Sequence, residues 1–176
     1  MSNILSVFER SEMMEYRDLY DKNRKLTGKT IAKGEPIPKG YYINVVVCFM
    51  QNSEGKFLMQ KRSPEKDGLW ATTGGHPKSG EDSLTGMHTE ILEELGLDID
   101  PKELKLVTTD QDDKIICDIY YLKKDINLND ITMQESEVAD VKYLTIDEIE
   151  TMYQKGEYKK SHYYMFKHCL ENLNQK

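Results

Sequence analysis

Cysteine is scarce in this chain, and its few cysteines show no pairing pattern. Cys48, Cys117 and Cys169 lie far apart in a sequence of 176 residues. Domains that depend on disulfides carry closely spaced cysteines, so we exclude a disulfide framework and expect free thiols in a reducing, cytoplasmic setting. Cys117 falls on an expected strand, and we interpret it as a core residue.

Long apolar segments are also missing. The longest apolar run, residues 43–50, is far shorter than the roughly 20 residues that a membrane-spanning helix needs. The first 18 residues contain acids and no extended apolar segment, so we expect no signal peptide. The sequence therefore predicts a protein that does not enter a membrane.

Positive charge is not in excess. Lysine and arginine number 24 against 31 acidic residues, which gives a net charge of −7. This balance favours solubility and disfavours a surface that coats nucleic acid or anionic lipid. We expect no stable nucleic-acid binding, although a local basic pocket remains compatible with the composition.

The length suits one domain, and the sequence contains no internal repeat or low-complexity tract. Residues 1–14 have weak helical character, and residues 29–40, rich in proline and glycine, are expected to form an irregular connection. Apolar and β-branched runs predict strands at 15–21, 41–50, 56–63 and 140–144, with two more within 104–122 around an acidic turn. A helix capped by Thr145 and a closing helix at 161–174 complete an α+β domain with layered architecture.

A third helix is expected between Gly80 and Gly96. Ser79 followed by Asp82 is a capping-box pattern, and Gly96 is typical of a helix end. The apolar positions recur at helical spacing and predict one buried stripe, formed by Leu84, Met87, Ile91 and Leu95. Gly86 lies near the arc of Glu90, Glu93 and Glu94, where a missing side chain allows another backbone to approach closely.

Three glutamates leave that helix on an arc distinct from the apolar stripe. At about 100° per residue, Glu90, Glu93 and Glu94 point to one side. Such a run is usually a solvated acidic face. Here, however, a Gly-Gly turn precedes the helix and Glu81 stands at its start, and converging carboxylates with loop carbonyls suit a hard divalent cation such as Mg²⁺.

These residues resemble the Nudix box, G-x5-E-x7-R-E-U-x-E-E-x-G-U with U aliphatic. Gly75, Glu81 and the segment 89–97 match every fixed position except one, because Thr89 replaces the arginine. The resemblance covers about residues 15–155 of a single domain spanning 1–176. It implies the Nudix fold, an α/β/α sandwich with a mixed β-sheet, and metal-dependent hydrolysis of a nucleoside diphosphate derivative or related small-molecule diphosphate.

The resemblance also implies roles for particular residues. Glu90, Glu93 and Glu94 would bind Mg²⁺ or Mn²⁺ and serve catalysis, with the Gly75 carbonyl as a further ligand. Glu81 would support the loop. The general base differs between family members, and here Glu135 and Glu137 are candidates, of which we take Glu135 as the catalytic candidate.

Four residues flanking the box are candidates for substrate binding. Lys61 and Arg62 end a strand beside the box and can face phosphates. Trp70 can stack on a base or anchor the loop, and His76 can contact phosphate, order the loop or bind metal. An aromatic-rich segment at 162–169 is a packed helix or a homodimer surface.

Two departures leave alternatives open. Thr89 cannot supply the charge or the forked donors of arginine, which keeps a non-catalytic nucleotide-binding module as an alternative. The segment around His76 also resembles isopentenyl diphosphate isomerase, a Nudix-fold enzyme with a catalytic cysteine. Gly74 stands where that cysteine would be, so proton transfer has no donor and we disfavour isomerase activity.

Overall fold

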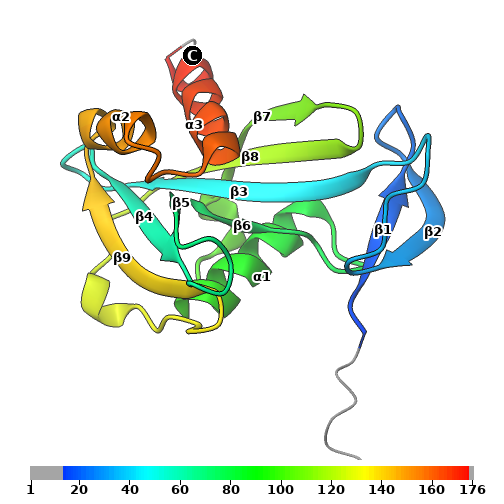
Figure 1. The fold of residues 1–176 in the computed structure, drawn as a ribbon, viewed down its shortest axis with the longest axis horizontal. Coiled ribbons are helices and arrows are strands. Elements are labelled where there is room, and N and C mark those ends of the chain that lie inside the picture. The colour runs from blue at the N-terminus through cyan, green and yellow to red at the C-terminus, as the bar shows by residue number, and fades with distance from the viewer. Residues whose placement is uncertain (1–13, 175–176) are drawn as a thin grey trace, which may run out of the picture.

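The computed structural model describes residues 14–174, which form a mixed sheet between helices and a small hairpin at one end (Figure 1). Short 3₁₀ turns span Pro101–Glu103 and Leu128–Asp130. The strands are β1 (Tyr16–Tyr20), β2 (Leu26–Ala32), β3 (Ile43–Gln51), β4 (Phe57–Arg62), β5 (Trp70–Ala71), β6 (Thr73–Gly75), β7 (Lys105–Gln111), β8 (Ile115–Lys123) and β9 (Val138–Leu144), and the helices are α1 (Ser83–Leu95), α2 (Ile146–Gln154) and α3 (Lys160–Leu173).

Strand β3 is the centre of the larger sheet. It pairs in parallel with β8 along its whole length, and β8 pairs antiparallel with β7. On its other side β3 pairs with β4 only near the turn that joins them, and then with β6. Strand β9 pairs with β4. The predicted mixed sheet of an α+β domain is therefore confirmed.

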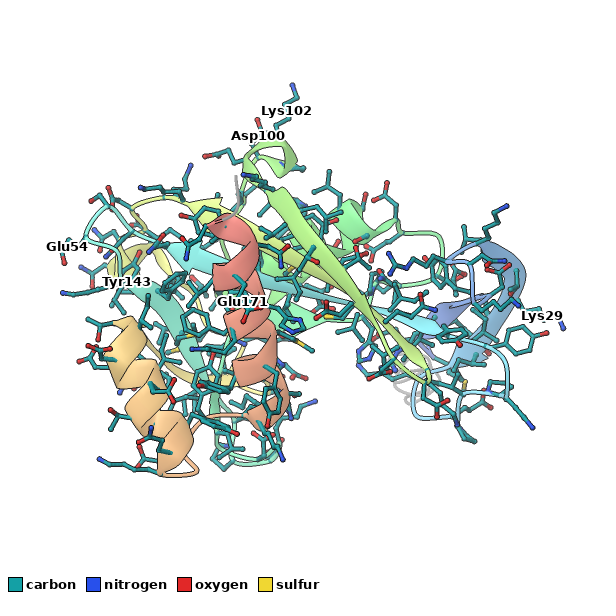
Figure 2. All side chains as sticks on the ribbon, turned by 90° about the horizontal axis from the view of Figure 1, so that it is seen from above. Lys29, Glu54, Asp100, Lys102, Tyr143 and Glu171 are labelled. Carbon is teal, nitrogen blue, oxygen red and sulfur yellow. The ribbon has the colours of Figure 1, made fainter. Side chains whose placement is uncertain are left out.

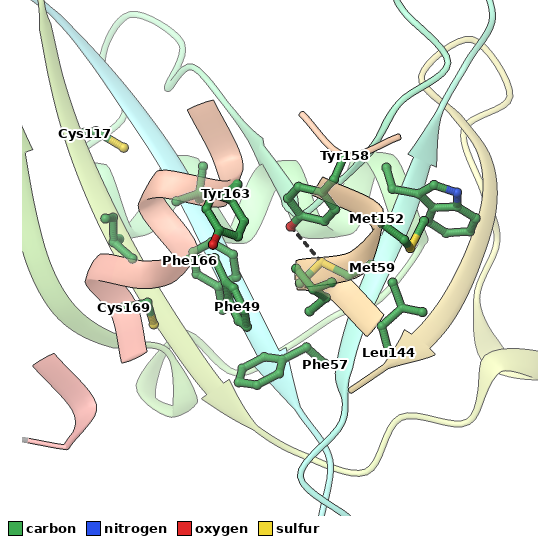
Figure 3. Close-up of a cluster of buried hydrophobic side chains, with 14 residues drawn as sticks. Phe49, Phe57, Met59, Cys117, Leu144, Met152, Tyr158, Tyr163, Phe166 and Cys169 are labelled. Carbon is green, nitrogen blue, oxygen red and sulfur yellow. Dashed lines mark hydrogen bonds between the residues drawn. The ribbon is translucent and has the colours of Figure 1, made fainter. Parts of the chain in front are cut away.

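The continuous apolar run of β3 is explained by burial on both faces of the sheet. Val46, Cys48 and Met50 face α1, in a core completed by the predicted stripe of that helix. Phe49 packs on the opposite face, where its ring lies 5.4 Å from that of Phe166 in α3 (Figure 3). Helix α1 thus lies on one face, and α2 and α3 lie on the other (Figure 1).

Two sequence predictions need correction. Residues 29–32 belong to β2 rather than to an irregular connection, because a two-stranded, largely exposed sheet needs no apolar alternation. Helix α1 is capped by Asp82, whose carboxylate accepts from the Thr85 amide, and not by Ser79. The Ser79 hydroxyl instead donates to Asp18 of β1 at 2.6 Å. Ser79 does not cap the helix because its hydroxyl is bonded to Asp18, a residue distant in sequence.

Other local predictions are confirmed. Gly96 ends α1 in the left-handed conformation, and Thr145 and Glu148 form the capping box of α2. The helical tendency of residues 1–14 falls almost wholly outside the described residues.

The β1–β2 hairpin is attached to the loop before α1. The Ser79 amide donates to the Tyr16 carbonyl at 2.8 Å, and the Gly80 amide donates to the Asp18 carboxylate at 2.9 Å. Lys29 marks the hairpin end of the molecule and Glu54 the opposite end (Figure 2). Among residues 14–174, no helix combines the length and the apolar character needed to span a membrane.

Candidate active site

Gly75 and Glu90 lie in direct contact, which places the box loop against the middle of α1. A Cβ atom built on Gly75 would lie 2.3 Å from Cδ of Glu90, so no side chain fits at this position. Gly86 has the same role in the first turn of α1, where an added Cβ would lie 2.5 Å from the Pro77 side chain. The two glycines let the loop run closely along α1, as we expected for Gly86.

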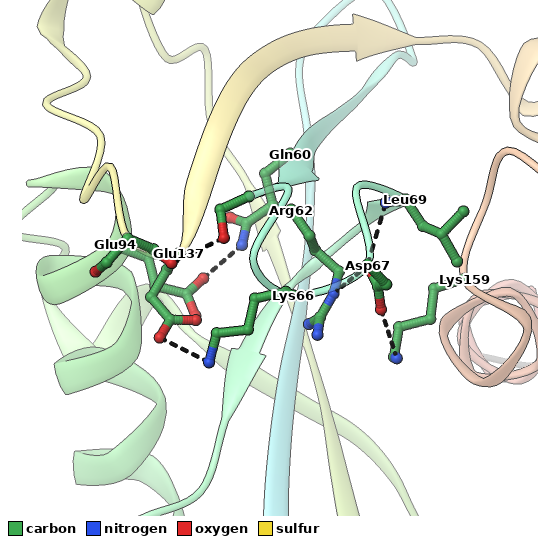
Figure 4. A network of polar contacts seen from close by, with 10 residues as sticks. Gln60, Arg62, Lys66, Asp67, Leu69, Glu94, Glu137 and Lys159 are labelled. Atoms are coloured by element: carbon green, nitrogen blue, oxygen red, sulfur yellow. Dashed lines mark hydrogen bonds and ion pairs between the residues drawn. The ribbon is translucent and has the colours of Figure 1, made fainter.

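Glu94 is the most deeply buried carboxylate of the box, with 6% of its surface exposed. Its Oε2 accepts a hydrogen bond from the Gln60 amide of β4 at 2.5 Å (Figure 4). Burial raises the pKa of Glu94 to about 8; the Gln60 hydrogen bond opposes this shift, and the charges of Glu90 and Glu137 add to it. A cation placed here would therefore offset an unfavourable charge.

Glu90 shares this character. Burial and then the charge of Glu93 raise the pKa of Glu90 to about 7, against the hydrogen-bonding effect of the His76 backbone amide. Arg17 of β1 interacts electrostatically with both Glu90 and His76. Burial, followed by the charges of Arg17 and Lys33, lowers the pKa of His76 to about 4, so its imidazole is neutral near pH 7. A neutral imidazole can accept a hydrogen bond or ligate a metal.

Glu93 differs from the other two carboxylates in its exposure and its partner. It is exposed and forms an ion pair with Lys78, which belongs to the loop between Gly75 and the helix. Both side chains of this pair are about two-fifths exposed, so the interaction contributes little stability and can open readily.

The three carboxylates predicted to bind metal therefore lie on one helix but do not form a closed cluster. Within residues 14–174, no set of three or more histidine, cysteine or acidic side chains is arranged to hold a metal ion. The donor types nevertheless fit a hard divalent cation, because burial disfavours the charged forms of Glu90 and Glu94, which a cation would stabilise, and the Gly75 backbone lies against Glu90. Binding through Glu93 as well requires its release from Lys78.

Glu81 braces the loop from the start of the box. Its Oε2 accepts from the Lys78 amide at 2.9 Å, and its Oε1 accepts from the Thr89 hydroxyl at 2.8 Å. The residue that replaces the arginine of the pattern is thus bonded to the first box glutamate. The neighbouring His88 contacts Asp98 at 2.9 Å.

The four expected substrate-binding residues are not gathered in one place. Lys61 is exposed on β4, while Arg62 donates to Asp67 at 2.7 Å and its charge lowers the pKa of Glu94. His76 lies in the loop beside Glu90. Trp70 is 8% exposed and belongs to the core on the α2–α3 face, so the structure does not bring it to the box.

The loop that leads into β9 supplies the candidates for general base. Glu135 is exposed on this loop, whereas Glu137 lies beside Glu94 and pairs with Lys66 at 3.0 Å (Figure 4). The Gln134 amide donates to the Glu94 carbonyl at 3.0 Å, which ties the loop to α1. The geometry favours Glu137 over Glu135.

Several residues near the box carboxylates were missed by sequence reasoning. Arg17 and Gln60 reach the site through hairpin docking and strand pairing, and neither carries a local signal. Lys78 lies inside the box itself, three residues before Glu81, so its position was a signal that could have been used.

Gly74 has no room for a side chain. A Cβ atom there would lie 2.5 Å from the Val46 carbonyl oxygen and 2.7 Å from a Val47 methyl group, because β6 pairs with β3 at this point. The position that would carry the isomerase thiol is therefore closed by backbone.

Comparison with known proteins agrees with the box and the fold. The NUDIX domain model matches residues 41–169. An uncharacterised Nudix hydrolase of Listeria monocytogenes is 34% identical over 149 residues, which cover 82% of this chain and 88% of the relative. The isopentenyl-diphosphate Delta-isomerase of Pectobacterium atrosepticum is 37% identical over 83 residues, but these cover only 45% of this chain and 46% of that enzyme.

The fold has solved counterparts. The crystal structure of a Deinococcus radiodurans protein superposes with a TM-score of 0.70 and 21% identity, covering 87% of this chain and 98% of the other. The domain match, the near full-length relative and the shared fold lead to one conclusion: the chain belongs to the Nudix family, as a Nudix-type pyrophosphohydrolase.

Proposed function

We propose that this protein hydrolyses the diphosphate linkage of a nucleoside diphosphate derivative or related organic pyrophosphate, with Mg²⁺ or Mn²⁺ as cofactor. Glu90, Glu93 and Glu94 would hold the metal with the Gly75 carbonyl. The metal would neutralise diphosphate charge and orient the attacking water. The proposal is supported by the buried charge of Glu90 and Glu94 beside a loop that excludes side chains.

The chain's own residues divide the remaining tasks. Gln60 orients the Glu94 carboxylate through its amide, and Gln60 is itself held because its Oε1 accepts from the Thr73 hydroxyl at 2.8 Å. Lys66 and Lys78 lie beside Glu137 and Glu93, and each can turn to a phosphate oxygen when its acidic partner is engaged elsewhere.

Glu137 is the proposed general base in place of Glu135. It is partly buried, and its position next to Glu94 puts a carboxylate within the site. Its loop is anchored, because the Glu137 carbonyl accepts from the Ser63 amide at 2.9 Å and the Ser136 carbonyl accepts from the Ser63 hydroxyl. An anchored base is suited to proton abstraction from water.

The single observation that carries the proposal is the burial of Glu94 against Gln60. The test is a panel of nucleoside diphosphate derivatives and organic pyrophosphates assayed with Mg²⁺, with Mn²⁺ and with chelator. We expect metal-dependent release of phosphate or monophosphate, and a loss of at least about a hundredfold in Glu94→Gln, with its circular dichroism spectrum and unfolding cooperativity unchanged.

The matched control is Glu135→Gln, which removes an exposed acid from the same loop as Glu137. It should retain activity, while Glu137→Gln should lose most of it. Wild-type turnover and metal dependence in Glu94→Gln would refute the site assignment. Tight nucleotide binding without hydrolysis across the panel would instead support the binding-module alternative raised by Thr89.

A further inference from the structure

A cavity of about 600 Å³ lies beyond the N-terminal end of α1, away from Glu90 and Glu94. The β1–β2 hairpin forms one wall, the starts of β3 and β8 form the floor, and the Gly80–Ser83 segment forms the edge nearest the box. Its volume is in the range of small-molecule sites. None of the roles derived above uses it.

The floor of this cavity carries a buried polar network. The Asn44 amide nitrogen donates to the Ile116 carbonyl at 3.1 Å and to the Asp118 carboxylate at 3.0 Å. The other oxygen of Asp118 accepts from the Thr109 hydroxyl at 2.6 Å. Asn44 and Asp118 are 8% and 9% exposed, so both are more than nine-tenths buried.

This network leaves one acceptor without a partner. Both contacts of the Asn44 amide group are to acceptors, so the nitrogen is fixed in place and Oδ1 must be the remaining atom. Among residues 14–174, Asn44 Oδ1 is one of the few buried side-chain atoms without a hydrogen-bond partner. A buried acceptor of this kind calls for a donor from outside the protein, because leaving it unpaired is unfavourable.

The residues that line the cavity indicate what kind of group carries that donor. Asp18 and Asp82 are occupied by the loop and the helix cap, and together with Glu81 and Asp118 they outnumber Arg24 and Lys25. An excess of acids disfavours phosphate in this space. Tyr20, Leu26 and Ile116 add apolar surface, which suits a flat or ring-shaped neutral group that donates N–H or O–H hydrogen bonds.

We propose that this cavity is a subsite for the neutral, donor-bearing group that is attached to the diphosphate, of the kind a nucleobase or a sugar provides. The identification of that group as part of the substrate rests on the proposed function; binding in the cavity does not. Asp82 and Glu90 are eight positions apart on or next to α1, roughly 12 Å, so one extended ligand can reach both places.

The β1–β2 hairpin connects the subsite to the box loop. Asp18 contributes to the cavity wall and also holds the box loop through Ser79 and Gly80. Asp18 therefore joins the cavity wall to the loop that follows Gly75 and His76. We assign Asn44 as the specificity-determining residue of this subsite.

The test is ligand-observed NMR and calorimetry with the full chain in EDTA, using adenosine, guanosine, cytidine, uridine and ribose as probes. We expect at least one probe to bind, and its Kd to rise about tenfold in Asn44→Leu, which removes the acceptor. Binding of nucleosides but not of ribose identifies the base as the donor; binding of both identifies the sugar.

A second variant guards against misfolding of Asn44→Leu. Leu26 is 63% exposed on the cavity rim, so Leu26→Trp can cover the opening without disturbing the core, and Leu128→Trp is a matched change at another exposed leucine. Leu26→Trp should weaken probe binding and Leu128→Trp should not.

Glu94→Gln separates this proposal from the proposed function. It should bind the probes as the wild type does in EDTA, even though hydrolysis is lost. The proposal is overturned if no probe binds the wild type, or if Asn44→Leu and Leu26→Trp both bind with unchanged Kd.

Discussion

The hydroxyl of Thr89 donates a hydrogen bond to Oε1 of Glu81, with the two oxygens 2.8 Å apart. The contact joins the residue that departs from the Nudix pattern to the first glutamate of the box. A neutral hydroxyl thus holds the loop acid where the pattern supplies an arginine. The loop is braced, but no positive charge is added beside Glu90.

Thr89→Val tests this brace. Valine keeps the shape of threonine but removes the donor, leaving Glu81 with the Lys78 amide alone. We expect the free energy of unfolding to fall by about 1 kcal/mol in urea titrations with EDTA. Thr151→Val, an exposed change on α2, is the control and should have no effect. Equal midpoints for the two variants would show that the hydrogen bond does not stabilise the fold.

Thr89→Arg tests whether Arg17 already supplies the missing charge. Arg17 interacts electrostatically with Glu90, so a second cation would compete for the same acid, and we expect no gain in kcat/KM in the wild-type background. Arg17→Met should lower activity and weaken Mg²⁺ dependence, and the double variant with Thr89→Arg should recover part of the loss. A clear gain from Thr89→Arg alone would show that the position opposite Glu90 lacks a cation.

Lys78→Met tests the ion pair that holds Glu93. Both partners are about two-fifths exposed, so the stability change should stay under about 1 kcal/mol. Mn²⁺ affinity, measured by calorimetry, should rise several-fold because Glu93 no longer has to be released. Lys124→Met breaks the equally exposed pair with Glu103 and is the control. Weaker Mn²⁺ binding by Lys78→Met would instead make Lys78 part of the binding arrangement.

The pH dependence of the metal-free protein follows from Glu90 and Glu94. Their folded pKa values, about 7 and about 8, lie above the usual 4.5, so the folded state binds more protons than the unfolded state between these values. The free energy of unfolding in EDTA should therefore fall as pH rises from about 5 to about 8. Glu94→Gln should flatten this decline, and saturating Mg²⁺ should oppose it. A rise in stability across this range would contradict the assignment.

Gly74→Cys tests the isomerase alternative. The new Cβ would overlap the Val46 carbonyl, so we expect a loss of about 1–3 kcal/mol in unfolding free energy and no conversion of isopentenyl diphosphate. Glu54→Cys, in an exposed turn, adds a thiol without strain and is the control. Isomerase turnover by wild type or by Gly74→Cys would reverse the interpretation of Gly74.

The sequence predicted those features that depend on local pattern. The box spacing located α1 and its glutamates, the Gly96 end followed from its conformational freedom, and the largely apolar run of 41–50 predicted a strand. These patterns lie within one element, so neighbouring residues suffice to read them.

Features that depend on distant contacts could not be predicted. Helix phase placed three glutamates on one arc, but it could not show that Glu93 pairs with Lys78 while Glu94 accepts a hydrogen bond from Gln60. Likewise Trp70 precedes the loop in sequence, yet the pairing of β5 with β4 directs it into the other core. Such outcomes depend on which strands pair in the folded sheet, and the spacing of residues along the sequence does not determine that pairing.

The pairing of β3 with β8 has a consequence for how the molecule assembles. Ile43 and Ile115 are partners in a parallel ladder, so chain segments 72 positions apart must meet before the central strand is secured. The whole box segment lies inside the loop that this meeting closes. Closure of so long a loop has a large entropic cost before any pairing compensates it, which slows folding. The box segment is therefore enclosed by a long-range contact, and a nascent chain cannot complete that contact until β8 has been synthesised.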